Sequence, residues 1–488
     1  MFSVRIRERF AGWPALLLAL SVLTFYRASV IVGNRLPLFF DEAQYWIWSQ
    51  QLDWGYYSKP PMVAWVIRLF APLGDSELAV RLGALLLHPL TALLVFACGR
   101  SMFGQRTGLW AALLFISLPL VGFNSLFMTT DAPLFFFWGL TTWALWRALQ
   151  GNAWRDWLLV GAAAGLGMLS KYSMAIFLPS AALALCLPAY RSQWRNRRLY
   201  AALLLALLIF LPNIWWNAHF GFVSFRHTAE IAQLDRALFH PAKLAEFLVA
   251  QIACAGPLAF VLLIGALCTR ASWRDPRLGF LAALTLPFLA LISLQALLAK
   301  ANPNWAAPAY FGGVLLVAAR LPPSKGFLMT LAIVANLLLL SGFYHYRDLA
   351  AMAGIELSRK SDPYARVLGW PQIGAAVQLE LARHPDATLT VATREEFALL
   401  GYYAHPRAGR LLIWNPEGRA ANHFHLVADA GKDLGGNFLF ATRQRLGETP
   451  AAAFERWTSL GSVSVPLYRR DCLTLYLYQG EHFKGYRP

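Results

Sequence analysis

Charged residues are scarce in this 488-residue sequence. Asp, Glu, Lys and Arg together make up 14% of the chain and hydrophobic residues 58%, whereas a soluble domain has roughly 25% charged residues. This balance excludes a disordered chain and a purely cytosolic protein. Apolar runs long enough to cross a bilayer, at about 20 residues per helix, recur along the sequence. We therefore expect a polytopic membrane protein.

Several motifs are also missing. The five cysteines include no Cys-x-x-Cys or Cys/His spacing typical of zinc, and a disulfide framework is not expected. Neither a Walker loop nor a dinucleotide fingerprint is present. Acidic residues are outnumbered 26 to 43 by basic ones, giving a net charge of +17. In a membrane protein this excess indicates cytoplasmic loops rather than nucleic-acid binding.

The apolar runs predict about eleven membrane-spanning helices. They cover residues 12–32, 77–98, 108–121, 132–147, 156–169, 174–189, 200–216, 246–268, 278–298, 306–320 and 326–344. The first run follows Arg5, Arg7 and Arg9 and lacks a small-residue cleavage site, so we interpret it as an uncleaved helix. The alternate loops that include this N-terminus hold about twice as many Lys and Arg as the others. The N-terminus is therefore expected in the cytoplasm.

From residue 345 onward the composition changes, because charged residues, His and Pro become frequent and no spanning run remains. Alternating patterns predict strands at 387–393, 423–428, 437–443 and 462–470, and helices at 374–384 and 395–404. We expect an all-α membrane domain over 1–344 and a small mixed α/β domain over 345–488. An odd number of spans places the second domain outside the cytoplasm, in the periplasm of a bacterial inner-membrane protein.

Two acidic sites fall on the same predicted outer face. Asp41 and Glu42 follow two phenylalanines, where desolvation would make a carboxylate a better base. The alternative is structural, since Asp41 with Gln44 three residues later also matches a helix-capping box. Asp131 precedes Ala-Pro and is equally consistent with a helix N-cap. Because ionisable residues at a membrane boundary are costly unless they are functional or paired, the two sites together favour a catalytic site.

Basic and polar residues of the outer loops are candidate ligands. Lys59 stands beside Pro60 and Pro61, which fix its backbone, and an ammonium held in this way suits a phosphate. Lys171 is a second candidate, although a lysine can also simply extend to the membrane interface. The segment 212–244 carries a loose set of basic residues whose spacing is not a compact metal motif. The candidates here and in the last loop, where a simple turn is the alternative, are His219, Arg226, His227 and Asn304.

Seven sequence pieces resemble a known family. They are DEAQYW at 41–46, YYSKPP at 56–61, ELAVRLGALL around Arg81, TTDAP at 129–133, LSKYS at 169–173, PNIWWNAHFGFVSFRHT at 212–228 and NPNWAAPAY at 302–310. Their identity and order resemble the PMT_2 or ArnT-like membrane glycosyltransferases, the bacterial relatives of dolichyl-phosphate-mannose protein mannosyltransferases. The resemblance implies a GT-C fold and transfer of a sugar from a polyprenyl-phosphate carrier to an acceptor at the outer face, with inversion at the anomeric carbon.

The resemblance also implies roles for individual residues. Asp41 is expected to be the general base for the acceptor hydroxyl, with Glu42 as its supporting neighbour and Asp131 as a second acid near the site. We expect Asp41 and Lys59 to face one water-excluded pocket. The predicted contacts to the donor phosphate are Lys59, Lys171 and Arg81. The predicted contacts to substrate are Tyr56, Tyr57, His219, Arg226, His227 and Asn304.

Two departures from the family pattern bear on the expected metal binding and sugar specificity. ArnT-like proteins have an acidic residue before the Lys-Pro of the second motif, implicated there in metal binding, and this chain has Ser58. We therefore assign no metal ligands and no cofactor, and a bound divalent metal stays open as an alternative. The family's DEAR form reads DEAQ here, so that Gln44 removes a positive charge and aminoarabinose specificity is not transferred.

The sequence leaves the substrates open. The expected partners are membrane lipids, a polyprenyl-phosphate-linked sugar and a glycolipid or glycan acceptor such as lipid A or the lipopolysaccharide core. A protein O-glycosyltransferase of the same fold and a transporter or flippase of a lipid-linked sugar are the alternatives. An assembly or anchoring protein is a third alternative, in which the acids are only helix caps.

Overall fold

The computed structural model describes residues 12–233, 239–406 and 410–486. Arg5, Arg7 and Arg9, which support the predicted orientation, lie outside these ranges. The chain forms two compact units. The first unit contains Met1–Gly33, Lys59–Val66 and Arg81–Tyr344, and the second contains Asn34–Ser58, Ile67–Val80 and His345–Pro488. The second unit thus combines most of the first predicted outer loop with the C-terminal part of the chain.

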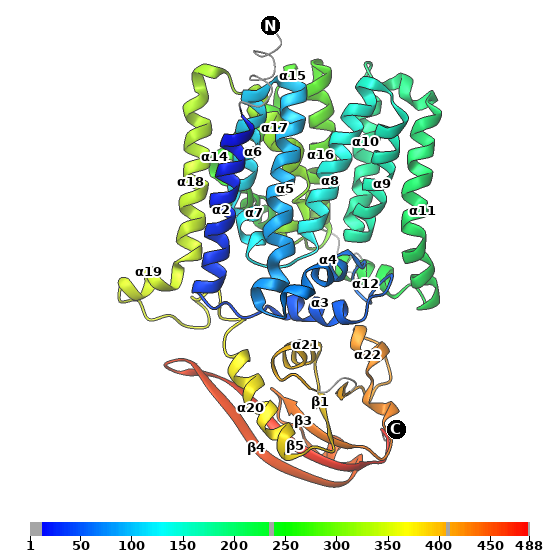
Figure 1. Ribbon diagram of the computed structural model, residues 1–488, viewed down its shortest axis with the longest axis vertical. Coiled ribbons are helices and arrows are strands. Elements are labelled where there is room, and N and C mark those ends of the chain that lie inside the picture. The colour runs from blue at the N-terminus through cyan, green and yellow to red at the C-terminus, as the bar shows by residue number, and fades with distance from the viewer. Residues whose placement is uncertain (1–11, 234–238, 407–409, 487–488) are drawn as a thin grey trace. The chain divides into compact units, whose positions relative to one another are not determined.

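The first unit is a helical bundle, and Figure 1 shows its long helices running alongside one another. Its core contains large apolar side chains such as Phe115, Trp138 and Phe280, which are fully buried. The longer helices are α2 (Trp13–Gly33), α5 (Glu77–Phe103), α8 (Asp131–Gly151), α9 (Trp154–Ser170), α11 (Arg197–His219), α16 (Pro276–Leu298) and α18 (Gly326–Tyr344). The shorter ones are α4 (Met62–Phe70), α6 (Gln105–Ser117), α7 (Pro119–Ser125), α10 (Phe177–Leu185), α12 (Val223–Ala232), α13 (Pro241–Ala255), α14 (Pro257–Cys268), α15 (Arg270–Arg274) and α17 (Ala309–Arg320).

Helix length and composition support a membrane-spanning protein. Among the described residues, five helices are long and apolar enough to cross a bilayer, or up to seven if each of two bent pairs counts as one span. Each of the eleven predicted segments corresponds to a helix or to a bent helix pair. The count of eleven spans and the sidedness of the termini stay predictions.

Two predicted segments are wrong as single straight helices. The segment 108–121 bends by 60° between α6 and α7, and the segment 246–268 bends by 111° between α13 and α14. Pro119 begins one helix after the break, and Gly256, with φ of +85°, separates the other pair. A proline lacks the backbone N–H that would continue the helix, and a glycine tolerates the left-handed backbone.

Buried polar side chains bind the carbonyls that these breaks release. Arg27, buried on α2, donates to the carbonyl of Ile116 at 2.7 Å and to Ser125 Oγ at 3.1 Å. Asn336 Nδ2 donates to the carbonyl of Ala255 at 3.1 Å. An unsatisfied backbone carbonyl in hydrocarbon costs several kcal/mol, so each of these carbonyls needs a hydrogen-bond donor. The structure therefore gives the buried charge of Arg27 a structural role.

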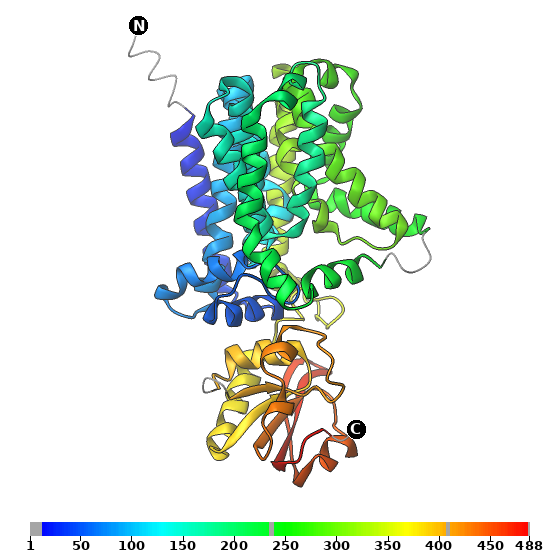
Figure 2. The ribbon, with the colours of Figure 1, turned by 90° about the vertical axis from the view of Figure 1, so that its right-hand side faces the viewer.

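The second unit contains a five-stranded sheet of order β2-β1-β3-β5-β4. The strand β1 (Ala387–Val391) pairs in parallel with β2 (Leu411–Ile413) and β3 (Asn437–Thr442). The long strands β4 (Phe454–Tyr468) and β5 (Asp471–Phe483) form an antiparallel hairpin beside β3. The helices of this unit are α3 (Phe40–Gln50), α19 (Tyr346–Met352), α20 (Trp370–Arg383), α21 (Arg394–Tyr403), α22 (His423–Val427) and α23 (Glu448–Ala452). Figure 2 shows α20, in yellow, beside the orange and red strands.

The expected mixed α/β composition of the C-terminal part is confirmed, with one wrong element. The predicted strand at 423–428 is the short helix α22. The side chain of Asn422 accepts hydrogen bonds from the backbone N–H groups of Phe424 and His425, which begins a helical turn. The ring of Phe424 stacks on Phe397 of α21 at 3.9 Å between centroids. The alternating hydrophobicity at 423–428 therefore reflects the buried side of a short helix and not a strand.

Candidate active site

The first unit brings three predicted site residues together. Lys171 Nζ lies 2.6 Å from Asp131 Oδ1, and Asn304 Nδ2 donates to Asp131 Oδ2 at 2.7 Å. The carboxylate of Asp131 is buried and the side chain of Lys171 nearly so, with 2% and 16% exposed. A buried carboxylate held at both oxygens has a fixed orientation, and its charge is balanced by one ammonium.

Helix ends and a short turn position this cluster. Asp131 is the first residue of α8, and Lys171 follows α9 in an extended conformation. Asn304 lies in the 3₁₀ turn Pro303–Ala306. Gln251 of α13 donates to the carbonyl of Pro303 at 3.0 Å and accepts from the Tyr310 hydroxyl at 2.8 Å. These two buried contacts hold the turn that presents Asn304.

The capping alternative for Asp131 is wrong. The N-cap position of α8 is Thr130, and Asp131 already lies inside the helix. Its carboxylate oxygens are bonded to Lys171 and Asn304 rather than to the backbone N–H groups of the first turn. The acid is therefore placed for an interaction between separate elements, which local sequence could not distinguish from a cap.

The Lys59 and Lys171 segments are joined by an apolar cluster. Met62, three residues after Lys59, packs with Leu169 of α9 and Phe210 of α11. Gly83 of α5 lacks a side chain where a Cβ would overlap Val66, so α4, which follows the Lys-Pro-Pro segment, packs closely on that helix. Arg81, two residues earlier, is fully buried, and its guanidinium lies 5.3 Å from the centroid of the Phe127 ring. Lys59, half-buried, begins this segment.

Asp41 lies in the second unit, and the capping alternative is wrong for this residue too. The helix α3 begins at Phe40, and Glu42 Oε2 accepts from the backbone N–H of Phe39 at 2.9 Å. Glu42, which is buried, is therefore the acidic residue that closes the helix start. Asp41 Oδ1 instead lies 3.5 Å from Arg394 Nη1 of α21. Since Asp41 and Lys59 belong to different units, their common pocket stays a prediction.

Tyr56 and Tyr57 pack within the second unit. The ring of Tyr56 stacks on Trp48 at 4.3 Å, and its hydroxyl donates to the Trp48 carbonyl at 2.9 Å. The Tyr57 hydroxyl donates to the carbonyl of Ala420 at 3.2 Å. His423 lies edge-on to Trp48 and Tyr56, and burial lowers the pKa of its imidazole from 6.5 to about 4. These contacts join the first outer loop to α22.

The helix α21 makes further contacts with the first outer loop. The Tyr403 hydroxyl accepts from the backbone N–H of Leu38 at 2.7 Å and contacts Glu77 at 3.3 Å. The Tyr402 hydroxyl donates to the carbonyl of Asp75. The second unit thus holds the loop that carries Asp41 from several sides.

The remaining predicted contacts lie near the end of α11 and on α12. His219 and Arg226 are exposed, and His227 Nδ1 lies 4.0 Å from Glu230 Oε2. Beneath them, Asn217 Oδ1 accepts from the backbone N–H of Ser224 at 3.2 Å and so ties α12 to α11. Within the described part of the chain, no group of three His, Cys, Asp or Glu side chains is arranged to hold a metal ion.

Sequence reasoning missed residues that are distant in the chain from the motifs. Arg394, Gln251 and His423 were not among the candidates, although each contacts or supports one of them. The only readable signal was the capping box Thr393-x-x-Glu396, which marks the start of α21 but not its neighbour.

Comparison with known proteins identifies the family of this chain. Residues 58–216 match the PMT_2 family, dolichyl-phosphate-mannose-protein mannosyltransferase. The chain is 31% identical to the lipid A galacturonosyltransferase RgtD of Rhizobium johnstonii, over 86% of this chain and 89% of that one. The chain belongs to the PMT_2 family of membrane glycosyltransferases. The sequence resemblance is confirmed, and the enzyme is a glycosyltransferase.

Other relatives place the glycosyltransferase near ArnT-like proteins. It is 29% identical to the undecaprenyl phosphate-alpha-4-amino-4-deoxy-L-arabinose arabinosyl transferase of Pseudomonas aeruginosa, over 89% of this chain and 78% of that one. The crystal structure of ArnT from Cupriavidus metallidurans superimposes with a TM-score of 0.66 at 16% identity, covering 97% of this chain and 98% of that one. This likeness shows a common GT-C fold.

Proposed function

We propose that this glycosyltransferase moves a uronic acid residue, galacturonic acid, from a polyprenyl phosphate to lipid A at the periplasmic face of the bacterial inner membrane. The observation that carries the proposal is the 31% identity to a lipid A galacturonosyltransferase over most of both chains. A lipopolysaccharide core galacturonosyltransferase of Rhizobium johnstonii is 25% identical over 92% of this chain and 93% of its own length. Gln44, in place of the arginine of the DEAR form, argues against aminoarabinose as the sugar.

The reaction needs a base and a stabilised leaving group. The acceptor hydroxyl attacks the anomeric carbon from the side opposite the phosphate, the bond from that carbon to the phosphate oxygen breaks, and polyprenyl phosphate leaves with the electron pair. Asp41 takes the hydroxyl proton, a contribution of about 10² to 10⁴ in rate. The product has the inverted anomeric configuration.

The phosphate contact is assigned to Lys59, with Lys171 and Arg81 as further positive charges. The packing of Met62 against Leu169 supports this assignment, because it joins the segments that carry the two lysines. Asp131, itself held by Asn304, fixes the ammonium of Lys171. That positive charge would therefore need little reorganisation when negative charge develops on the departing phosphate. We assign contacts with substrate to His219, Arg226, His227, Tyr56 and Tyr57.

The test uses purified enzyme in nanodiscs with lipid A and a polyprenyl-phosphate-linked galacturonate. Mass spectrometry should show lipid A gaining one hexuronic acid residue while free polyprenyl phosphate is released in equal amount. Gain of an aminopentose from the corresponding donor, and no gain of hexuronic acid, would assign ArnT-like activity instead. Labelling of a peptide acceptor would support a protein O-glycosyltransferase. In proteoliposomes, donor crossing the bilayer without release of polyprenyl phosphate would support a flippase.

Two variants test the residue roles in the same assay. Asp41→Asn should lower the transfer rate by about 10² to 10⁴ because it removes the base. Lys59→Met should lower it by about 10²-fold or more, as expected when one charge on a leaving group is lost. Lys243→Met is the matched control, because that lysine is exposed on α13 and paired with Glu246. Full activity of Asp41→Asn would refute the assignment of the base.

A further inference from the structure

We propose that Arg394, in the first turn of α21, is a positioning residue for Asp41. The inference rests on the proposed function, in which Asp41 is the base. The guanidinium Nη1 of Arg394 lies 3.5 Å from Asp41 Oδ1 and 3.4 Å from Gln44 Oε1. A residue some 350 positions away in the sequence thereby contacts two side chains of the first acidic motif.

An aromatic ring fixes the guanidinium plane. The Arg394 guanidinium carbon lies 4.8 Å from the centroid of the Phe40 ring, which precedes Asp41. Phe40 and Phe39 pack against each other at 4.4 Å, and Arg366 lies over both rings at 5.6 and 4.9 Å. Cation–π contact with Phe40 and the bonds to Asp41 and Gln44 restrict Arg394 from two directions.

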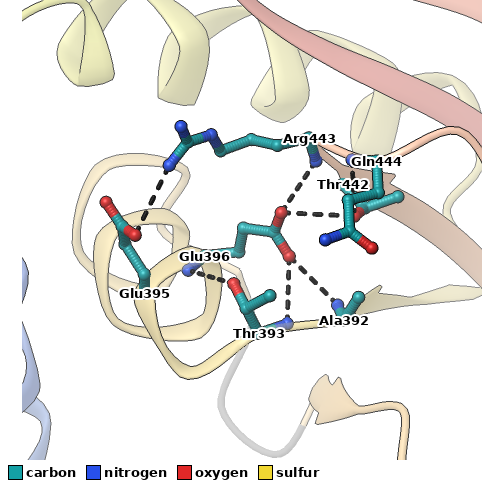
Figure 3. Close-up of polar contacts among 7 residues, drawn as sticks. All are labelled: Ala392, Thr393, Glu395, Glu396, Thr442, Arg443 and Gln444. Atoms are coloured by element: carbon teal, nitrogen blue, oxygen red, sulfur yellow. Dashed lines mark hydrogen bonds and ion pairs between the residues drawn. The ribbon is translucent and has the colours of Figure 1, made fainter.

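The buried carboxylate of Glu396 holds the backbone that leads into α21 (Figure 3). Its oxygens accept from the backbone N–H groups of Ala392, Thr393 and Arg443 at 2.7 to 3.1 Å and from the Thr442 hydroxyl at 3.2 Å. The Thr393 hydroxyl in turn accepts from the Glu396 N–H. Burial raises the pKa of Glu396 in spite of these donors. The start of α21 is thus tied to the ends of β1 and β3.

Close packing also fixes α21 against α3. Gly401 of α21 lies where a Cβ would come within 2.8 Å of Ile47 Cδ1 of α3. The Arg394 contact is therefore part of the packing between α3 and α21. This packing determines where the guanidinium can reach.

The exposure of the pair indicates what the contact is for. The side chains of Asp41 and Arg394 are 36% and 42% exposed, and ion pairs this exposed contribute little to stability. An arginine that contacts one carboxylate oxygen nevertheless restricts rotation of the carboxylate. Asp41 would then meet the acceptor hydroxyl in a fixed orientation, as a general base requires.

The experiment compares Arg394→Gln, Arg394→Lys and Arg394→Ala with Arg366→Gln, using lipid A and the galacturonate donor. Arg394→Gln should lower kcat by about 10- to 100-fold, as is typical for a residue that orients a reactive group. The KM values for donor and acceptor should stay within about twofold, since the residue touches neither. Arg394→Lys should recover part of kcat, and added guanidinium should recover part of the activity of Arg394→Ala. Arg366→Gln, which removes a guanidinium from the same rings, should retain the wild-type kcat.

Three outcomes would overturn the inference. They are equal kcat for Arg394→Gln and Arg366→Gln, a raised acceptor KM with unchanged kcat, and a loss of activity matched by a loss of folded protein in a thermal melt. In an Asp41→Asn background, Arg394→Gln should have no further effect on kcat. If Asp41→Asn alone is fully active, the proposed base is wrong. If Asp41→Asn is inactive while Arg394→Gln is unaffected, only the positioning role is wrong.

Discussion

Asp131 and Lys171 form a buried ion pair, with 2.6 Å between Oδ1 and Nζ. Sequence patterns suggested each residue separately, the acid as a catalytic group or cap and the lysine as a phosphate contact or an interfacial side chain. The pairing means that neither charge can be altered alone without changing the environment of the other. Any role in catalysis is therefore a property of the pair together with Asn304.

The pair predicts strong coupling between substitutions. Lys171→Met should destabilise the protein by about 3 to 5 kcal/mol, because it leaves a buried carboxylate without a countercharge. Asp131→Asn with Lys171→Met should cost less than Lys171→Met alone, since no buried charge remains. Thermal or denaturant unfolding in detergent measures these costs. Additive effects of the two changes would contradict the coupling.

Glu42 and Asp41 should separate stability from activity. Glu42→Ala removes the acceptor for the Phe39 N–H and should lower the free energy of unfolding by about 1 kcal/mol. Asp41→Asn should leave stability nearly unchanged, because its side chain is partly exposed and an ion pair as exposed as that with Arg394 contributes little. Melting curves and transfer rates of both variants make the comparison. A larger stability loss for Asp41→Asn than for Glu42→Ala would contradict this assignment.

His423 should make stability depend on pH. Burial lowers the pKa of the folded imidazole to about 4, whereas the unfolded chain binds the proton near 6.5. Because the folded state holds the neutral form, its contribution is full above pH 6.5 and is lost as the pH falls toward 4. The loss is on the order of 2 kcal/mol after allowance for the partial exposure of the ring.

A melting series between pH 7.5 and about 4 measures this effect. His423→Gln should flatten the dependence, and His425→Gln, one residue from Phe424 on the same helix, is the comparison. The pKa of His425 is lowered too, chiefly by burial, but its shift is the smaller of the two, so its variant should retain most of the slope. Equal slopes for wild type and His423→Gln would contradict the prediction.

Gly256 should be intolerant of a side chain. A Cβ there would overlap the Asn336 side-chain oxygen, and the backbone has φ of +85°. Gly256→Ala should therefore destabilise the bend between α13 and α14 by about 1 to 3 kcal/mol. Gly265→Ala, on α14 with open space at its Cβ, should be neutral or slightly stabilising. Both are measured as shifts in the thermal midpoint, and equal midpoints for the two variants would refute the packing argument.

Some of the fold was readable because hydrophobicity is a local property. Each apolar run predicted from sequence corresponds to a helix or a bent pair, and the patterns at 387–393 and 437–443 correspond to β1 and β3. The breaks at Pro119 and Gly256 were missed because each is stabilised by a distant side chain that donates a hydrogen bond to a carbonyl beside the bend. The pattern at 423–428 was wrongly interpreted as a strand because polar and apolar residues also alternate in this short helix, which buries one ring.

By itself, the sequence determined the membrane character, the helical segments, the family and the motif residues that include Asp41, Lys59 and Asp131. These follow from composition and from short spacings along the chain. Only the tertiary structure decided that Asp131 pairs with Lys171 and Asn304, that Glu42 rather than Asp41 closes a helix, and that Arg394 contacts Asp41. Such contacts join side chains separated by tens to hundreds of residues, and chain packing, which no local pattern records, sets their distances.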